Sequence, residues 1–403
     1  MKVVRWARLL PALLLVLAPF LEGCGDFWQA PGSSGGSGNT STTLSSGVFY
    51  VLNQTTMQIV AYEINSGSLS TIGSYALAAA PYSIAIAPGN GFLYVSTIAG
   101  IYLYTIGSTG ALTIGNGGSV ISTDIAEAMQ VDTTGTWLVD AVTGTSGVIV
   151  NAISITSSGT LNSTTEEQQS YQITNASVEK MAISGDDANV FLALGEGGTL
   201  IVPFTSTNTN PLSATGKTIS TVTSGASALS VAVDPVLSGA TAPRLFYIGE
   251  TEASSSSGGL RAFDYSSLGG GTVSEISGSP YSAGGLAPAA ILPSLDGSYV
   301  YVASGQGASS DGVLEGFNIA SSTSGSTTTY TLSSISSAST GIEPQGLAED
   351  SDSNFVLAVS SGGSYDLEAY IFDTTTAGKL DTSITSTTGT DPTGASAVAA
   401  EAP

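Results

Sequence analysis

The residues that could do chemistry in this chain are few, and they lie at repeated positions. Glu127 and Glu179 each precede a short apolar run, and Lys180 follows the second glutamate. A carboxylate in such a place could act as a base that activates water, and a lysine could stabilise an oxyanion. The 403 residues include no histidine, so the commonest general base and metal ligand is missing. Glu127, Glu179 and Lys180 are therefore the catalytic candidates.

Two other interpretations of these glutamates stay open. Each could be a solvated loop carboxylate without a chemical role. Alternatively, converging carboxylates could bind a cation, since Ca²⁺ takes oxygen ligands. The segment Asp350–Asn354 resembles the start of a calcium loop, but Phe355 and Ser361 stand where the pattern needs glycine and glutamate. We expect this segment to be a turn between two strands.

The candidates lie at the start of a unit that recurs along the chain. In its clearest form, Pro81–Ser96, two strands flank the turn Pro88–Gly91, whose glycines and asparagine tolerate positive φ. A third strand such as Ile101–Tyr104 follows, and then a weakly apolar fourth segment. Similar units begin near Ala126, Val178, Ala228, Leu286 and Pro344. Four short strands with a period of about 50 residues are typical of a β-propeller blade.

The two ends of the repeat region complete one more unit. Residues 48–52 form a second strand with no first strand before it, and Met57–Ile64 forms the third. Pro392–Val398 forms a first strand with nothing after it. Pairing of Ala395–Val398 with Phe49–Leu52 would leave no open sheet edge. The sequence thus predicts an all-β, seven-bladed β-propeller over residues 46–403, closed by its N- and C-terminal strands.

The recurring form Pro-x-x-Ile-Ala-Ile-x-Pro-x-x-Gly-x-Leu-Tyr-Val resembles the lactonase, or phosphogluconolactonase-like, family of seven-bladed propellers. The resemblance implies this fold and hydrolysis of sugar lactones. It also implies a Pro-His-x-His loop and cations for an acidic substrate. This chain has no histidine, and Lys180 is the only cation in the corresponding loops. The family's activity is therefore not carried over to any residue.

A propeller usually binds its ligand at the mouth of the central channel, beside the loops that enter the innermost strands. The residues at or next to the position after the aligned proline are the ligand-binding candidates, namely Tyr82, Glu127, Glu179, Glu343 and Gln345. Five aromatic residues recur in the second strands, and we expect them to pack between blades: Tyr94, Phe191, Tyr247, Tyr301 and Phe355.

The first residues indicate export. Residues 1–23 combine a basic start with the short apolar run Leu9–Phe20, which is typical of a secretory signal. Leu21-Glu-Gly-Cys24 resembles the bacterial lipobox, which implies cleavage before Cys24 and lipid attachment to its thiol. Residues 24–45 are rich in Gly, Ser and Thr and would form a flexible tether. With one cysteine, no intrachain disulfide can form.

Charge narrows the possible partners. The net charge is −23 and only 10% of the residues are charged, so the chain lacks the basic cluster that nucleic-acid binding requires. The lipid on Cys24 would be the only membrane contact. We therefore predict a membrane-anchored lipoprotein of the bacterial cell envelope whose propeller binds a carbohydrate or protein at the channel mouth. A lactone hydrolase that uses the mouth carboxylates is the first alternative, and a structural surface protein is the second.

Overall fold

The computed structural model describes residues 47–65, 67–254, 257–270, 272–385 and 391–401. The predicted signal peptide, Cys24 and tether lie outside these residues. Residues 42–403 form one compact unit, to which every described strand belongs. The only helices in the described part are two 3-10 turns, η1 (Asn116–Gly118) and η2 (Tyr265–Gly269). No helix within the described ranges is long and apolar enough to cross a membrane.

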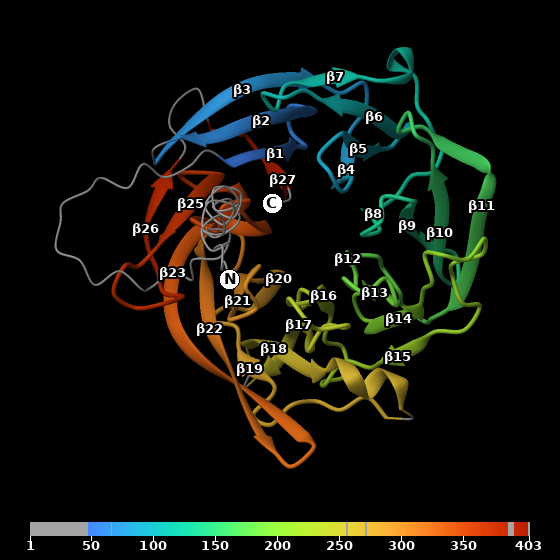
Figure 1. Ribbon diagram of the computed structural model, residues 1–403. Coiled ribbons are helices and arrows are strands. Elements are labelled where there is room, and N and C mark those ends of the chain that lie inside the picture. Colours follow the sequence, from blue (N-terminus) through green and yellow to red (C-terminus); the bar gives the residue numbers. More distant parts are fainter. Residues whose placement is uncertain (1–46, 66, 255–256, 271, 386–390, 402–403) are drawn as a thin grey trace, which may run out of the picture. The chain divides into compact units, whose positions relative to one another are not determined.

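Five sheets of four antiparallel strands stand around a common axis (Figure 1). One contains β4 (Pro81–Ile86), β5 (Phe92–Thr97), β6 (Gly100–Ile106) and β7 (Leu112–Ile114). The next contains β8 (Ala128–Val131), β9 (Trp137–Gly144), β10 (Gly147–Ile155) and β11 (Leu161–Gln172). A third contains β12 (Lys180–Ile183), β13 (Asn189–Ala193), β14 (Thr199–Pro203) and β15 (Lys217–Ile219). A fourth contains β16 (Ala228–Val233), β17 (Leu245–Ser254), β18 (Ser257–Asp264) and β19 (Tyr281–Ser282).

The fifth four-stranded sheet joins the two ends of the fold. It contains β27 (Ala395–Ala400), β1 (Gly47–Asn53), β2 (Gln58–Asn65) and β3 (Ser68–Ala76), in that order. In the register between β27 and β1, Val398 faces Val51 and Ala400 faces Phe49. The predicted closure by N- and C-terminal strands is therefore confirmed. The backbone groups of β1 are satisfied on both sides, so the ring has no free edge there.

The remaining strands differ from the prediction of seven separate blades. They form one seven-stranded sheet instead of two four-stranded sheets. Its strands are β20 (Ala287–Pro293), β21 (Tyr299–Gly305), β22 (Asp311–Ser324), β23 (Thr327–Glu349), β24 (Phe355–Gly362), β25 (Leu367–Phe372) and β26 (Leu380–Thr385). The physical reason is the 23-residue strand β23, which pairs first with β22 and then with β24 without a break. The separate blades therefore number five, and the seven-bladed prediction is wrong as stated.

Local sequence explains the strands and their turns. In the clearest unit, Gly89 and Asn90 both have positive φ, of 81° and 54°. Ala87 and Phe92 are joined across this turn by a backbone hydrogen bond of 2.9 Å. The predicted turn at Pro88–Gly91 is thus confirmed. Its glycine and asparagine adopt the left-handed conformation at little steric cost.

The core lies between adjacent sheets and not in one central cluster. For example, Leu93 and Val95 of β5 pack with Tyr50 and Leu52 of β1. The aromatic residues of the second strands are fully buried in such clusters, as predicted, and each is 0% exposed: Tyr94, Phe191, Tyr247, Tyr301 and Phe355. Burying these large rings supplies much of the apolar area that holds neighbouring sheets together.

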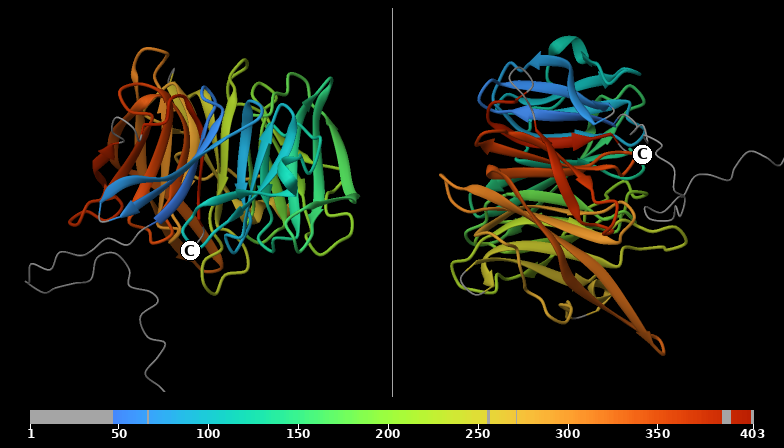
Figure 2. Two further views of the ribbon diagram at one scale, coloured as in Figure 1. Left: turned by 90° about the horizontal axis from the view of Figure 1, so that it is seen from above. Right: turned by 90° about the vertical axis from the view of Figure 1, so that its left-hand side faces the viewer.

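The strand directions give the ring two different faces. Each innermost strand begins at one face, and the hairpins between second and third strands return to it. We call this the mouth face. The chain enters β1 at Gly47 and ends β27 at Ala400 on the other side, which we call the opposite face. The long β22–β23 ribbon projects past the ring on this same side (Figure 2).

Candidate functional site

Loops that enter the innermost strands place the predicted site residues on the mouth face. Tyr82 lies in β4, Glu127 directly precedes β8, Glu179 directly precedes β12 and Lys180 opens it. Glu343 and Gln345 lie in the last part of β23, where this strand becomes the innermost one. The repeated units therefore bring these residues to one face of the ring from four different units.

Glu127 is used to hold loops together. Its Oε2 accepts hydrogen bonds from the backbone N of Thr143 at 2.9 Å and from Thr143 Oγ1 at 2.5 Å. The same hydroxyl accepts from the backbone N of Val178 at 2.9 Å. This chain of bonds joins β9 to the loop that enters the next sheet. A carboxylate engaged in this way is a poor match for a base that must receive a proton from water.

Lys180 makes the longest connection at this face. Its Nζ donates to the backbone oxygen of Gln345 at 2.9 Å, which joins β12 to β23. These strands are not neighbours, because β16 and β20 stand between them in the ring. Lys180 therefore reaches across the centre of the ring. Desolvation lowers the pKa of Lys180, and the neighbouring charge of Glu179 partly opposes this effect.

Three of the predicted residues are connected to one another. Gln345 Nε2 donates to the backbone oxygen of Glu343 at 3.1 Å, so Lys180, Gln345 and Glu343 form one connected group. Glu179 accepts at Oε1 from Ser177 Oγ at 2.9 Å. Tyr82 is 43% exposed. Among the described residues, no hydrogen bond joins Tyr82 or Glu127 to the Lys180 group. The ligand-binding role of all five candidates stays a prediction.

Glu343 has an unusual backbone. Its φ is +52°, a backbone conformation that residues other than glycine, asparagine and aspartate rarely adopt. Its Oε2 accepts from Ser361 Oγ at 3.3 Å, and the following residue, Pro344, is buried. The strained residue thus holds an exposed carboxylate at the mouth face. Strain of this kind is often found at binding sites.

Residues 350–354 form a turn, as predicted. Asp350 Oδ1 accepts from the backbone N of Asn354 at 2.8 Å and of Phe355 at 2.6 Å. Asp132 caps the corresponding turn before Trp137 in the same manner, at 2.6 Å. Within the described ranges, no three side chains of metal-ligating type are grouped closely enough to hold a metal ion.

Sequence reasoning missed a set of exposed apolar residues on the mouth face. Of the large apolar side chains that are exposed in the described part, all but Ile114 and Leu295 lie in the mouth-face loops or, for Tyr82, at the start of an innermost strand. The set is Met57, Tyr82, Ile98, Ile125, Val222, Leu286 and Tyr365. The sequence signal that could have identified these residues is a single aliphatic residue within a loop of Ser, Thr and Gly, as in Thr221-Val222-Thr223. Only Tyr82 was among the candidates.

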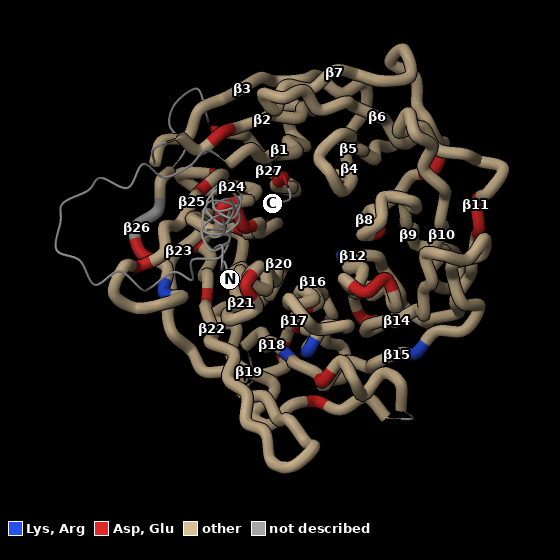
Figure 3. The backbone as a smooth tube through the Cα atoms, in the orientation of Figure 1, with Lys and Arg blue, Asp and Glu red and all other residues tan. Residues whose placement is uncertain are grey.

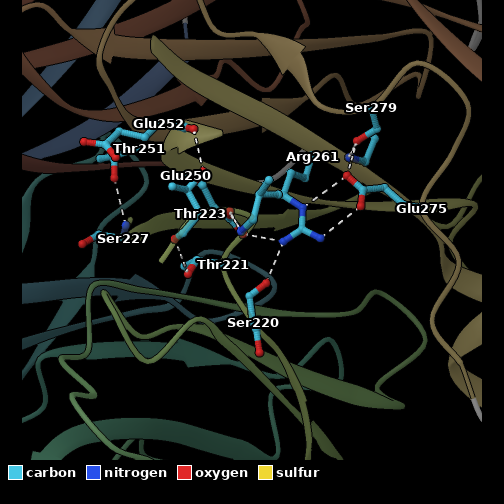
Figure 4. Close-up of polar contacts among 12 residues, drawn as sticks. Ser220, Thr221, Thr223, Ser227, Glu250, Thr251, Glu252, Arg261, Glu275 and Ser279 are labelled. Carbon is cyan, nitrogen blue, oxygen red and sulfur yellow. Dashed lines mark hydrogen bonds and ion pairs between the residues drawn. The ribbon is translucent and has the colours of Figure 1, made fainter. Parts of the chain in front are cut away.

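A buried arginine fixes one of these loops (Figure 4). Arg261 Nη1 donates to Glu250 Oε1 at 2.7 Å and to the backbone oxygen of Ser220 at 2.9 Å. Its Nη2 donates to Glu275 at 3.0 Å. The second oxygen of Glu250 accepts from the backbone N of Val222 at 2.9 Å, yet the Val222 side chain is 50% exposed. The backbone of Val222 is therefore held by an ordered network, while half of the residue's surface is open to solvent.

Two hollows lie away from these residues. One, of about 380 Å³, is on the opposite face and is lined by Glu63, Glu401 and the 106–110 turn. The other, of about 290 Å³, lies between the first and second sheets and is lined by Asp124 and Glu166 among others. Neither is lined by a predicted site residue. Acidic positions far outnumber basic ones around the ring (Figure 3).

Comparison with known proteins identifies the fold. No family model and no curated protein matches the sequence. The periplasmic gluconolactonase of Pseudomonas aeruginosa superimposes with a TM-score of 0.61 and 16% identity, over 89% of this chain and 99% of that one. A putative 6-phosphogluconolactonase of Bacteroides fragilis gives 0.65 and 16%, over 90% and 99%. A functionally unknown protein of Desulfotomaculum acetoxidans gives 0.62 and 13%, over 88% and 99%.

These similarities define the class of the protein. It is an all-β propeller whose structural neighbours include lactonase-like propellers. At 16% identity the likeness concerns the fold alone. A propeller of this kind can carry unrelated functions, because function depends on the side chains of its loops.

Proposed function

We propose that this protein is an exported, membrane-anchored lipoprotein of the bacterial cell envelope, and that its propeller binds a ligand or partner at the mouth face. The observation that carries the proposal is the gathering of exposed apolar side chains in the mouth-face loops, while the opposite face has Leu295. Single exposed apolar residues occur on any protein surface, and it is their restriction almost entirely to one face of the ring that favours an interaction site there.

The proposal gives the anchor a definite relation to the binding face. The chain enters the propeller at the opposite face, through Gly47. A tether over residues 24–45 that is attached there would leave the mouth face accessible to ligands. A structural surface protein, the second alternative of the sequence analysis, would not require exposed apolar groups on one face.

The lactonase alternative has one specific observation in its favour. Lys180 has a lowered pKa, lies beside Glu179 and reaches across the centre of the ring. In such a reaction Glu179 would activate water, and Lys180 would stabilise the oxyanion that forms at the lactone carbonyl. Against this, Lys180 already donates to Gln345, and Glu127 is bonded twice to Thr143.

We also infer that the seven-stranded sheet provides two sectors of the ring, so that the ring has seven. Inner strands contact one another in the order β4, β8, β12, β16, β20, β23 and β27, and β27 returns to β4. A core cluster packs Ala290, Tyr301 and Leu314 against Val356 and Tyr370, in the way that other clusters pack between separate sheets. This supports counting β23 in both sectors.

The experiment that separates these functions uses the compact unit 42–403, which contains all strands of the fold. Hydrolysis of gluconolactone and 6-phosphogluconolactone is measured for the wild type, Glu127→Gln and Glu179→Gln. Binding of a glycan panel, of Ca²⁺ and of cationic peptides is measured by calorimetry. We expect no turnover above the spontaneous rate and binding of at least one ligand class. Turnover by the wild type that both variants lose would establish lactonase activity instead. Absence of binding in every titration would favour a structural role.

A further inference from the structure

The chemistry of the mouth face points to one kind of ligand. Its exposed apolar residues are mainly aliphatic and come from well-separated loops, including Ile98, Ile125, Val222 and Leu286. They are 54%, 43%, 50% and 52% exposed, respectively. Their distribution around the ring favours a ligand that extends over several loops, and not one that enters a single small hollow.

Carboxylates stand among these apolar residues. Asp124 precedes Ile125 and Glu127 follows it by two residues. The backbone of Glu252 accepts a hydrogen bond from Thr223, the neighbour of Val222, so these two mouth-face segments lie side by side. Acidic residues of the mouth-face loops and strand ends that are not buried include Asp124, Glu127, Glu179, Glu196, Glu252, Asp311, Glu343 and Asp391.

Cations are nearly absent from the same face. Among the described residues, the remaining basic side chains lie elsewhere or are buried: Lys217 bonds to the 268–270 segment, Arg244 and Lys379 pair with aspartates at turns of the opposite face, and Arg261 is 7% exposed. Lys180 directs its amine to the carbonyl of Gln345. The mouth face therefore presents negative charge and apolar surface together.

We propose that the mouth face binds a cationic, amphipathic polypeptide segment of a partner protein. The inference rests on the proposed binding function and specifies its partner class. Lys and Arg side chains of such a segment would pair with the carboxylates, and its apolar side chains would cover the aliphatic residues. Complementary charge steers the encounter and fixes orientation, while apolar burial supplies the larger part of the affinity.

Three other occupants fit less well. Carbohydrate sites favour aromatic stacking surfaces, but the exposed aromatic residues here are Tyr82 and Tyr365, set among aliphatic ones. A second copy of the chain would place one acidic mouth face against another, which like charge disfavours. An anionic membrane surface would be repelled for the same reason.

The test uses a helical Lys/Leu amphipathic peptide as the probe and the compact unit 42–403 as the protein. A Glu/Leu peptide of the same pattern tests the charge, and a Lys/Ser peptide tests the apolar contribution. We expect the Lys/Leu peptide to bind, and the two control peptides to bind more weakly by at least about tenfold. Raising the salt from about 50 to about 300 mM should weaken the binding by several fold.

Variants locate the site. The double variant Ile98→Ser with Leu286→Ser should bind the Lys/Leu peptide about tenfold more weakly than the wild type. The double variant Glu252→Gln with Glu343→Gln should bind it about fivefold more weakly. The matched controls are Leu295→Ser and Asp352→Asn, which make the same chemical changes at exposed positions of the opposite face. The controls should leave the dissociation constant unchanged, and thermal melts verify that all variants are folded.

The outcomes distinguish failure of this inference from failure of the proposed binding function. Binding of glycans without binding of the Lys/Leu peptide would overturn this inference and leave the proposed function intact. Equal effects of the mouth-face variants and their controls would also overturn it. Concentration-dependent dimerisation that Ile98→Ser with Leu286→Ser abolishes would assign the face to a second copy of the chain. Failure of every ligand to bind would overturn the proposed function itself.

Discussion

Single polar side chains in this propeller mostly hold loops and turns in place. Glu127, Asp350 and Glu250 each use one carboxylate to accept backbone hydrogen bonds from a turn or a neighbouring loop. Because the chain has so few cations, these carboxylates depend on backbone donors and hydroxyl groups for compensation. This explains why strongly acidic composition is compatible with a compact ring.

The hydrogen bonds of Asp140 compensate the burial of its carboxyl group only in part. It is 0% exposed on β9, accepts from Asn151 Nδ2 at 2.9 Å, and its Oδ2 has no hydrogen-bond partner among the described residues. Burial raises the pKa of Asp140 to about 7, the hydrogen bond from Asn151 opposes this, and the charges of Asp124 and Glu166 add to it.

This shift predicts a pH dependence of stability. Between the unfolded pKa of 3.8 and the folded value of about 7, the folded state holds the extra proton, so the free energy of unfolding decreases as the pH rises through this window. Asp140→Asn should remove the contribution of Asp140 and be more stable than the wild type at pH 8 by roughly 2–4 kcal/mol. A weaker dependence should remain, because burial also raises the pKa values of Glu349, Asp234 and Asp350. Urea denaturation of both proteins from pH 4 to 8 measures this. Asp381→Asn, an exposed control, should follow the wild type, and parallel curves for Asp140→Asn would contradict the prediction.

Neighbouring sheets are connected by a repeated contact between a second strand and a turn. The hydroxyl groups of Tyr50, Tyr94 and Tyr301 donate to the backbone oxygens of Gly110, Gly159 and Gly378 at 3.0, 2.9 and 2.7 Å. Gly110 and Gly159 lie in the turn between the third and fourth strands of the next sheet, and Gly378 lies in the turn between β25 and β26 of the seven-stranded sheet that also contains Tyr301. Each of the three has a φ between 74° and 80°. The contact needs glycine for two reasons, the left-handed backbone and the close approach of the neighbouring strand.

Substitution of one such glycine tests both reasons. A Cβ at Gly159 would stand 2.5 Å from the Phe92 ring, and the φ of +80° is unfavourable for alanine. Gly159→Ala should therefore lower the free energy of unfolding by about 2–4 kcal/mol, from backbone strain together with overpacking. Gly239→Ala is the matched control, because Gly239 has a φ of +81° and open space around it. Its cost should be about 1–2 kcal/mol. Equal losses in the two variants, measured by chemical denaturation, would show that the contact with Phe92 is unimportant.

The whole molecule is a closed ring with two chemically different faces. Closure by β27 and β1 places both ends of the described chain on the opposite face, away from the mouth face. The edges that an open arrangement would expose are paired, which protects the ring from edge-to-edge association. This arrangement would allow an anchored protein to present its mouth face to partners.

The predicted anchor is tested in the whole chain. In cells that process lipoproteins, we expect the wild type to be recovered in the membrane fraction and Cys24→Ser in the soluble fraction, because lipid on Cys24 would be the only membrane contact. Leu21→Ala adds a second change within the lipobox-like segment and should act in the same direction. Mass spectrometry of the N-terminal peptide reports the acyl groups directly. Membrane association of Cys24→Ser equal to that of the wild type would exclude this mode of anchoring.

The sequence alone determined the parts of the fold that follow from local patterns. Alternating apolar residues and Gly or Asn turns predicted the strands. The incomplete units at the two ends predicted that Ala395–Val398 pairs with Phe49–Leu52, and the structure supplied the register, in which Val398 faces Val51. Apolar burial and turn conformation depend on residues near one another in the chain, so these predictions needed no coordinates.

The tertiary structure decided what depends on distant segments. It joined two predicted blades through β23. The first part of this strand pairs with β22 and the last part pairs with β24, so the strand continues from one blade into the other. It brought Lys180 to Gln345, which are 165 residues apart. It also gathered Ile98, Val222 and Leu286 from separate loops onto one face. The position of a loop around the ring is set by the packing of all the sheets, and no local pattern encodes it.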